Sequence, residues 1–158
     1  MEQESEQVYQ MKIILDTNII FSALLSTNST IGELIFDSEE VFEFYSCNYM
    51  RLEIEKHWEK LKKISKLTDK ELQESLFRLF TKIHFINEEQ ISEKIWLKAE
   101  TLTADIDIDD TDFVALTNYL KGVLWTGGKE LYTGLKNKGF KKVVSTQELL
   151  RKRTKQKK

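Results

Sequence analysis

The sequence contains no proline, one cysteine and two histidines among its 158 residues. Because proline is the strongest marker of turns and helix ends, element boundaries must be predicted from hydrophobic periodicity alone. The single cysteine, Cys47, excludes an internal disulfide and is typical of a reducing cytoplasm, where we expect the protein to act. Together with His57 and His84 it does not supply the four ligands of a structural zinc site.

Long hydrophobic runs are also absent. No stretch approaches the roughly eighteen apolar residues of a membrane span, so no membrane association is predicted. Residues 1–10 are polar and acidic and lack the basic and apolar regions of a secretory signal. The composition, 41% hydrophobic and 32% charged, predicts one folded domain over residues 11–150, preceded by a polar extension (1–10) and followed by a basic tail (151–158).

The net charge of −2 conceals an uneven distribution. Residues 136–158 contain ten Lys or Arg and one acid, which leaves 14 basic and 25 acidic residues in the rest of the chain. An acidic body with a basic C-terminal segment indicates a metal site together with a surface for a polyanion such as RNA. A solvated, frayed tail explains the terminal lysines equally well.

Strand-like and helix-like periods alternate along the whole chain, with a capping box at Thr68–Glu71 and Asn48 as a further N-cap. The predicted strands cover residues 12–16, 42–46, 84–86, 123–126 and 142–144. The predicted helices cover residues 18–25, 31–36, 49–67, 69–83, 88–102, 110–121, 129–138 and 146–152. Strands separated by helices predict an α/β fold, a three-layer α/β/α sandwich around a central parallel sheet of about five strands.

Three acidic residues occupy equivalent positions in this pattern. Asp16 ends the first predicted strand, Glu53 lies early in the helix after the second, and Asp110 lies in the first turn of the helix that leads to the fourth. Because the carboxyl ends of parallel strands share one edge, these side chains are expected to meet there. Clustered carboxylates without partner cations are the ligands that Mg²⁺ and Mn²⁺ prefer.

Each acid alone also fits a purely structural role. Asp16 and Asp110 are good helix caps, and Glu53 could pair with a basic residue one turn along its helix. Taken together, however, five aspartates within eight residues exceed any capping need and would repel one another without a cation. These are Asp105, Asp107, Asp109, Asp110 and Asp112.

Two other motifs fit this acidic run only in part. An EF-hand loop beginning at Asp105 would need glycine at its sixth position and glutamate at its twelfth, where the sequence has Asp110 and Leu116. The short Asp-x-Asp-x-Thr pattern of haloacid-dehalogenase-like phosphatases should follow a hydrophobic strand, whereas Asp107 follows a predicted helix.

Four segments, in this order, resemble those of prokaryotic PIN domains. They are Lys12–Ile20, Glu53, Asp109–Leu116 and Leu124–Lys129, and the resemblance extends from residue 11 to about residue 150. It implies an α/β/α sandwich and, for many members, a Mg²⁺- or Mn²⁺-dependent ribonuclease, as in the VapC-like toxins of toxin–antitoxin pairs, which often dimerise.

The resemblance also implies roles for individual residues. Asp16, Glu53 and Asp110 match the first three acids of the family site, with Asp16 and Asp110 as direct metal ligands and Glu53 as a ligand or a residue that orients water. Asn18 and Thr126 match supporting polar residues.

The position of the fourth family acid is Gly128, because the usual Thr-Gly-Asp-Lys reads Thr-Gly-Gly-Lys here. Asp112 or Glu130 could replace that acid, the chain could be a natural relative that binds without cutting, or the aspartate could have been lost through a single base change. The resemblance therefore predicts a metal-dependent ribonuclease with RNA as substrate, an antitoxin partner and a homodimeric state. A catalytically silent PIN module is the alternative, and a metal-dependent phosphatase is a more remote one.

Overall fold

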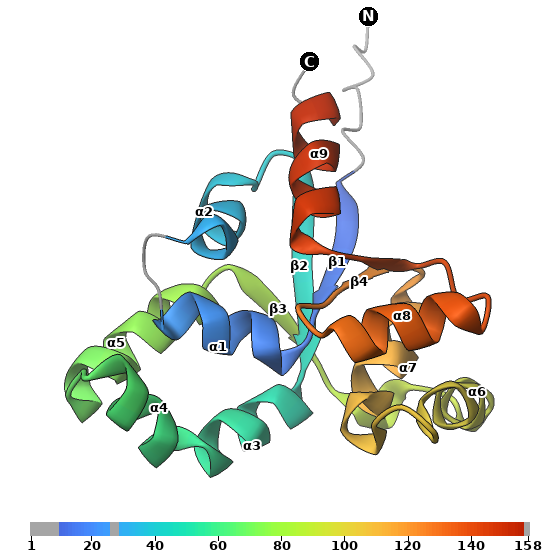
Figure 1. The fold of residues 1–158 in the computed structure, drawn as a ribbon, viewed down its shortest axis with the longest axis horizontal. Helices are drawn as coiled ribbons and strands as arrows, with labels where there is room; N and C mark the ends of the chain where they lie inside the picture. The colour runs from blue at the N-terminus through green and yellow to red at the C-terminus, as the bar shows by residue number, and fades with distance from the viewer. Residues whose placement is uncertain (1–9, 26–28, 157–158) are drawn as a thin grey trace, which may run out of the picture.

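A computed structural model of the protein describes residues 10–25 and 29–156, and within them one five-stranded, entirely parallel sheet forms the centre of the molecule (Figure 1). The strands lie in the order β3-β2-β1-β4-β5. Their bounds are Met11–Leu15 (β1), Phe42–Cys47 (β2), Ile83–Ile86 (β3), Val123–Trp125 (β4) and Val143–Val144 (β5). The predicted fold class is thereby confirmed.

Helices connect all consecutive strands. Between β1 and β2 lie α1 (Thr17–Leu25) and α2 (Thr30–Asp37), and between β2 and β3 lie α3 (Asn48–Lys56), α4 (Trp58–Ser65) and α5 (Asp69–Phe80). The connection from β3 to β4 contains α6 (Glu93–Thr103) and α7 (Thr111–Leu120), with the short 3₁₀ turns η1 (Glu88–Gln90) and η2 (Ile108–Asp110). Helix α8 (Lys129–Asn137) joins β4 to β5, and α9 (Thr146–Gln156) follows β5.

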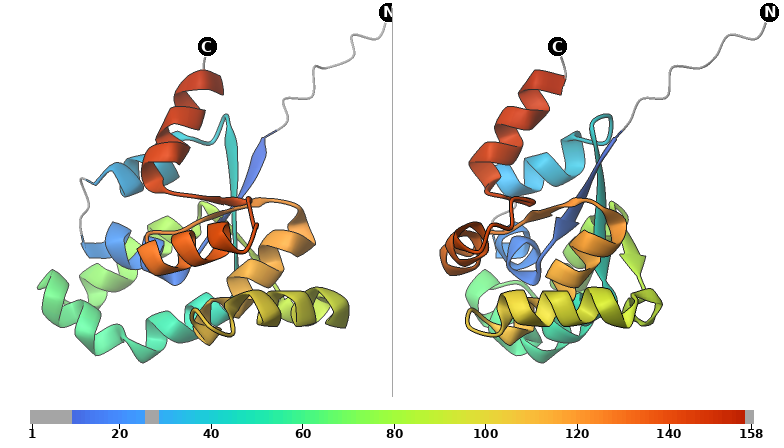
Figure 2. Two further views of the ribbon diagram at one scale, coloured as in Figure 1. Left: turned by 45° about the vertical axis from the view of Figure 1, so that its right-hand side comes forward. Right: turned by 90° about the vertical axis from the view of Figure 1, so that its right-hand side faces the viewer.

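The strand order explains why helices cover both faces of the sheet. The connections from β1 to β2 and from β2 to β3 move across the sheet in one direction, and the connection from β3 to β4 moves in the other. Because crossovers between parallel strands are right-handed, α1–α5 and α6–α7 must lie on opposite faces. The two views in Figure 2 show this arrangement, with α7 against the sheet and α6 outside it.

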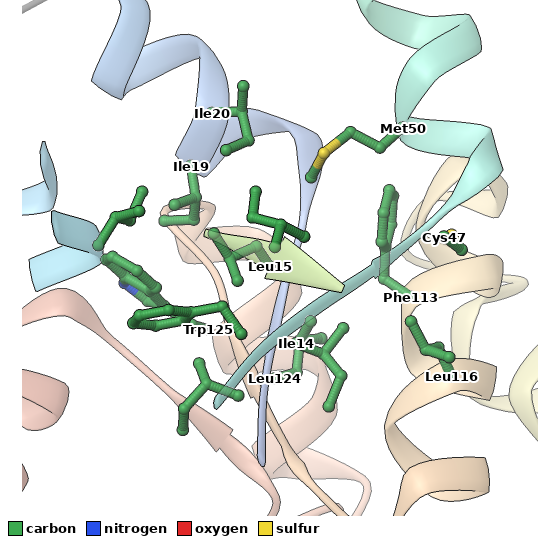
Figure 3. Packing of buried hydrophobic residues seen from close by; sticks show 14 of the residues in the cluster. Ile14, Leu15, Ile19, Ile20, Cys47, Met50, Phe113, Leu116, Leu124 and Trp125 are labelled. Atoms are coloured by element: carbon green, nitrogen blue, oxygen red, sulfur yellow. The ribbon is translucent and has the colours of Figure 1, made fainter. Parts of the chain in front are cut away.

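Strand β1 lies in the middle of the sheet, and its second half is completely buried. Ile13, Ile14 and Leu15 have no exposed surface, as expected for a strand covered by helices on both sides. Figure 3 shows residues of α1, α3, α7 and β4 gathered around it, among them the fully buried Trp125. The indole N–H of Trp125 donates to the Thr146 hydroxyl over 3.0 Å, so α9 is attached to this core.

Most predicted elements occur within two residues of their expected bounds, and the capping box at Thr68 is present. The long helix predicted over 49–67 is wrong as a single element, because it breaks at His57 into α3 and α4. The break lets Leu61 of α4 pack into the core, while Ile64 of the same helix is 53% exposed. The helix predicted over 88–102 likewise divides into η1 and α6.

The cap predicted for α3 is also different. Asn48 is the first residue of the helix rather than its N-cap. The backbone N–H groups of Asn48 and Tyr49 each donate to the carboxylate of Glu88 over 2.9 Å. Glu88, which follows β3, therefore accepts the first free backbone N–H groups of α3, which follows β2. This contact is possible because β2 and β3 are neighbours in the sheet.

The chain ends were predicted to be a polar extension and a basic tail. Residues 1–9 lie outside the described part of the chain, and helix α9 continues through the first basic residues of the predicted tail to Gln156. Within the described ranges, no helix alone combines the length and apolar character of a membrane span, although the bent pair α1 and α2 meets both criteria when taken together.

Candidate metal-binding site

Asp16 lies directly after β1 at the carboxyl edge of the sheet and is 2% exposed. Its Oδ1 accepts a hydrogen bond of 3.1 Å from the Ile19 backbone N–H, and its Oδ2 accepts one of 2.5 Å from the Thr126 hydroxyl. The first bond is a helix-capping contact at the start of α1. The Asp16 side chain therefore caps α1 and also lies where the site was predicted. Its orientation is fixed by one hydrogen bond from α1 and one from Thr126, directly after β4.

Glu53 reaches the same edge from α3. Its half-buried carboxylate accepts a hydrogen bond of 2.5 Å from the hydroxyl of Thr17, the residue after Asp16. This bond joins the first turn of α1 to the second turn of α3 and holds the second acid beside the first.

Asp110 comes from the opposite face, at the junction of η2 and α7. It occupies the N-cap position of α7 but makes no side-chain capping hydrogen bond, so its carboxylate is not used by the helix. Asp107 and Asp109 have other contacts, since Asp107 accepts from the Asp109 backbone N–H over 2.9 Å and Asp109 accepts from the Tyr49 hydroxyl over 2.8 Å.

Asp16, Glu53 and Asp110 influence one another electrostatically. Burial raises the pKa of Asp16 to about 6, with a smaller contribution from the charge of Glu53 and an opposing one from the Thr126 hydrogen bond. Burial and then the charge of Asp16 raise the pKa of Asp110 to about 7, and Glu53, Asp107 and Asp109 add to the effect. Like charges held together in a partly desolvated site favour protonation of the carboxyls.

The donor set fits a divalent metal ion. No ion pair in the described ranges involves Asp16, Glu53 or Asp110, so their charges are not compensated by Lys or Arg. Two or three carboxylates with room for water are what Mg²⁺ and Mn²⁺ require. A bound cation would also remove the repulsion that raises their pKa values.

Asp112, the further candidate ligand, lies in a different group. Its carboxylate is close to that of Glu88 and to the Cys47 thiol, and ligand atoms of these three residues lie within 4.8 Å of one another. Burial and the charge of Glu88 raise the pKa of Asp112 to about 6, and burial also strongly raises the pKa of Cys47. Because Glu88 already accepts two backbone N–H groups and the thiol is protonated, this group is explained as a structural contact between β2, η1 and α7.

Gly128 lies in the loop between Thr126 and α8, close to Asp16. Its backbone N–H donates to the Thr126 hydroxyl over 3.0 Å, and this hydroxyl in turn donates to Asp16. A Cβ atom at this position would be 3.5 Å from the Thr126 oxygen and 3.9 Å from Leu131, which is ordinary contact. A side chain thus fits at this position.

Glu130, the other candidate replacement for the fourth acid, is exposed. It lines a groove between α8 and the end of α6, together with Asp105 and Lys138. The structure therefore places neither Glu130 nor Asp112 in the hydrogen-bonded chain that links Gly128 to Asp16.

Of the supporting residues, Thr126 is 3% exposed and contacts Asp16 directly, whereas Asn18 is exposed at the start of α1. Sequence reasoning missed Thr17 and Glu88. Thr17 directly follows Asp16 in a predicted strand–helix junction, which was a usable signal. Glu88 had none, because its contacts depend on β3 lying next to β2.

The basic C-terminal segment is divided in space. Lys136 lies in α8 and Lys138 is its C-cap, whereas α9 extends toward the end of the molecule at which β1 begins, away from the acidic edge, in both Figure 1 and Figure 2. Arg153 of α9 forms an ion pair of 3.5 Å with Glu33 of α2. RNA contact by this segment stays a prediction, and its α9 part lies far from the candidate site.

The arrangement defines an α/β fold with an acidic site at the carboxyl edge of a parallel sheet. The family model for the PIN domain matches residues 14–152, so the chain belongs to the PIN domain family. The fold is similar to that of a solved structure of VapBC2 from Rickettsia felis bound to a DNA fragment from their promoter. That likeness has a TM-score of 0.61 at 15% identity and covers 85% of this chain and 97% of the other. A comparison with curated proteins gave no match.

Proposed function

We propose that this protein is a PIN-type, Mg²⁺- or Mn²⁺-dependent endoribonuclease that hydrolyses RNA phosphodiesters and acts as the toxin of a toxin–antitoxin pair. The observation that carries the proposal is the meeting of Asp16, Glu53 and Asp110 at one edge of the sheet, uncompensated by Lys or Arg in the described ranges. Membership of the PIN domain family supports it.

Each side chain has a distinct part in this proposal. Asp16 and Asp110 would hold the metal, and Asp16 is the more rigid of the two because both of its oxygens accept hydrogen bonds. Glu53, held by Thr17 through one oxygen, keeps the other for the metal or for a water molecule. A bound divalent ion would lower the pKa of water and stabilise negative charge on the phosphate.

A second candidate function follows from Gly128, which supplies no carboxylate where the family has an acid. A silent PIN module that binds RNA or a protein would need the fold and not the full acid set. Such a module should keep its binding after further loss of Asp16 or Asp110, whereas a nuclease loses activity.

Cleavage of a mixed pool of single-stranded RNA in Mn²⁺ tests the proposal. The chain is compared with Gly128→Asp, and Asp110→Asn serves as the blank. Cleavage by the chain and not by the blank supports the enzyme with three acids, and cleavage by Gly128→Asp alone supports the site while showing that Gly128 disarms it. If neither form cuts a broad pool but RNA still binds, the silent module is the better explanation.

The partner, oligomeric state and compartment belong to the same proposal. We expect a protein antitoxin, in line with the VapBC2 assembly that shares the fold, and in addition a homodimer and a cytoplasmic location. Co-expression with the neighbouring open reading frame, followed by light scattering of the purified protein, tests the first two.

A further inference from the structure

A cavity of about 350 Å³ lies between α1 and α4. Its wall on α1 begins with Asn18, two residues after Asp16, and its wall on α4 begins with His57, one helical turn after Glu53. The break that divides α3 from α4 falls at His57 and therefore forms one corner of this cavity.

The lining divides into an apolar interior and a polar rim. Phe21, Leu61 and Ile64 are among the apolar residues. The rim consists of the amide of Asn18, the imidazole of His57 and the ammonium of Lys60. The rings of Phe21 and His57 pack edge to face with centroids 5.7 Å apart, so an aromatic corner is already formed.

The rim carries basic side chains, His57 and Lys60, whereas the acidic edge carries carboxylates. His57 follows Glu53 by one helical turn, and its backbone N–H donates to the Glu53 carbonyl oxygen over 3.1 Å, so this end of the rim adjoins the helical turn that carries Glu53. A phosphodiester bound at the carboxylates through a metal would have these basic groups on the side of α4. Attraction to them would turn the adjoining nucleotide toward the cavity.

We propose that this cavity is a nucleobase subsite, which receives the base next to the scissile phosphate and sets the sequence preference of cleavage; the inference rests on the proposed function. Single-stranded RNA is read by proteins through splayed bases that stack on aromatic rings and hydrogen-bond through their edges. Phe21 and His57 supply the rings, Asn18 supplies an amide donor and acceptor, and the volume lies in the range of small-ligand pockets.

Binding of ten-nucleotide single-stranded RNAs, each with one abasic position moved along the strand, tests the subsite without relying on cleavage. Fluorescence anisotropy is measured in Ca²⁺, and each RNA is confirmed intact on a gel. The expected result is one position at which loss of the base weakens binding about tenfold.

Ile64→Trp is the test variant, because Ile64 is 53% exposed and a larger side chain fills the cavity without disturbing the core. Leu97→Trp is its matched control, since Leu97 is 55% exposed on α6 and does not line the cavity. In Ile64→Trp the abasic effect at that position should disappear, while Leu97→Trp should retain it.

A second pair of variants tests the rim. Lys60→Glu should weaken binding of all the RNAs, and Lys63→Glu, an exposed lysine of the same helix outside the cavity lining, should weaken it less. Identical abasic profiles in Ile64→Trp and Leu97→Trp, as expected if the cavity instead holds a segment of a protein partner, would overturn the subsite alone. A chain that neither binds nor cuts RNA would overturn the subsite and the proposed function together.

Discussion

The Thr17 hydroxyl donates a hydrogen bond of 2.5 Å to the carboxylate of Glu53. Thr17 follows Asp16 in the chain and is 4% exposed, so two acids that are 37 positions apart are linked by one buried side chain. The bond uses Oε1 of Glu53, so Oε2 is the oxygen that can face a ligand.

Replacing this hydroxyl should weaken metal binding more than folding. Thr17→Val keeps the shape of the side chain but removes the donor, so Glu53 loses its fixed orientation, and Mn²⁺ affinity should fall about tenfold by isothermal titration calorimetry. Thr17→Ser keeps the donor and should bind Mn²⁺ almost as the parent does. Equal affinities for Thr17→Val and the parent would show that Glu53 needs no such support.

An aspartate at position 128 should be tolerated and should strengthen metal binding. The position has extended backbone at the N-cap of α8 and room for a Cβ atom, so Gly128→Asp should change the free energy of unfolding by only a few tenths of a kcal/mol. The added carboxylate should raise Mn²⁺ affinity about tenfold in the same titration. Gly127→Asp adds the same charge one residue away and should not reproduce the gain.

Stability should fall with rising pH in the absence of metal. Asp16 and Asp110 have folded pKa values of about 6 and about 7, above their ordinary value of 3.8, so the folded protein binds more protons than the unfolded chain between about pH 4 and pH 7. The midpoint of thermal unfolding should therefore be lower at pH 7.5 than at pH 5.5.

Two controls separate this effect from other titrations. Acids with lowered pKa values, such as Asp69 and Asp105, have already lost their protons at pH 5.5 and do not contribute in this range. Asp16 and Asp112, each with a pKa of about 6, titrate in the same range, so Asp110→Asn should reduce the dependence without abolishing it, and Mn²⁺ should restore stability at pH 7.5. A midpoint that rises from pH 5.5 to pH 7.5 without metal would contradict the arrangement of the acids.

Two glycines should respond in opposite ways to alanine. A Cβ atom at Gly122 would lie 2.5 Å from Ile14 and 2.7 Å from the Lys12 carbonyl oxygen, both on β1, so Gly122→Ala should destabilise the protein by about 2 kcal/mol. At Gly128 the added atom makes ordinary contacts, and Gly128→Ala should be close to neutral. Urea unfolding of both variants measures the difference.

The sequence was sufficient to predict the parallel sheet, because strand-like and helix-like periods alternate along the chain, and the placing of Asp16, Glu53 and Asp110 at strand–helix junctions is what led to the predicted site. The capping of α3 by Glu88 was not predictable, since it depends on which strands are neighbours. The break at His57 had no local signal either, because no proline or glycine occurs there and the packing of α4 against α1 determines it.

Helix α7 was predicted correctly, but the orientation of the aspartates before it was not accessible from the sequence. Asp109 contacts Tyr49 and Asp112 contacts Glu88, and only Asp110 is left facing Asp16. The backbone conformation of η2 determines the direction in which each of these aspartate side chains points, and the periodicity of the sequence does not reveal that conformation.

The strand order also has a consequence for synthesis of the protein. The central strand β1 and Asp16 are synthesised before the other four strands, whereas β4 and Thr126, which complete the surroundings of Asp16, come more than a hundred residues later. A partly made chain therefore has an incomplete sheet and neither Asp110 nor Thr126. The surroundings of Asp16 are therefore complete only after β4, the fourth of the five strands, has been synthesised.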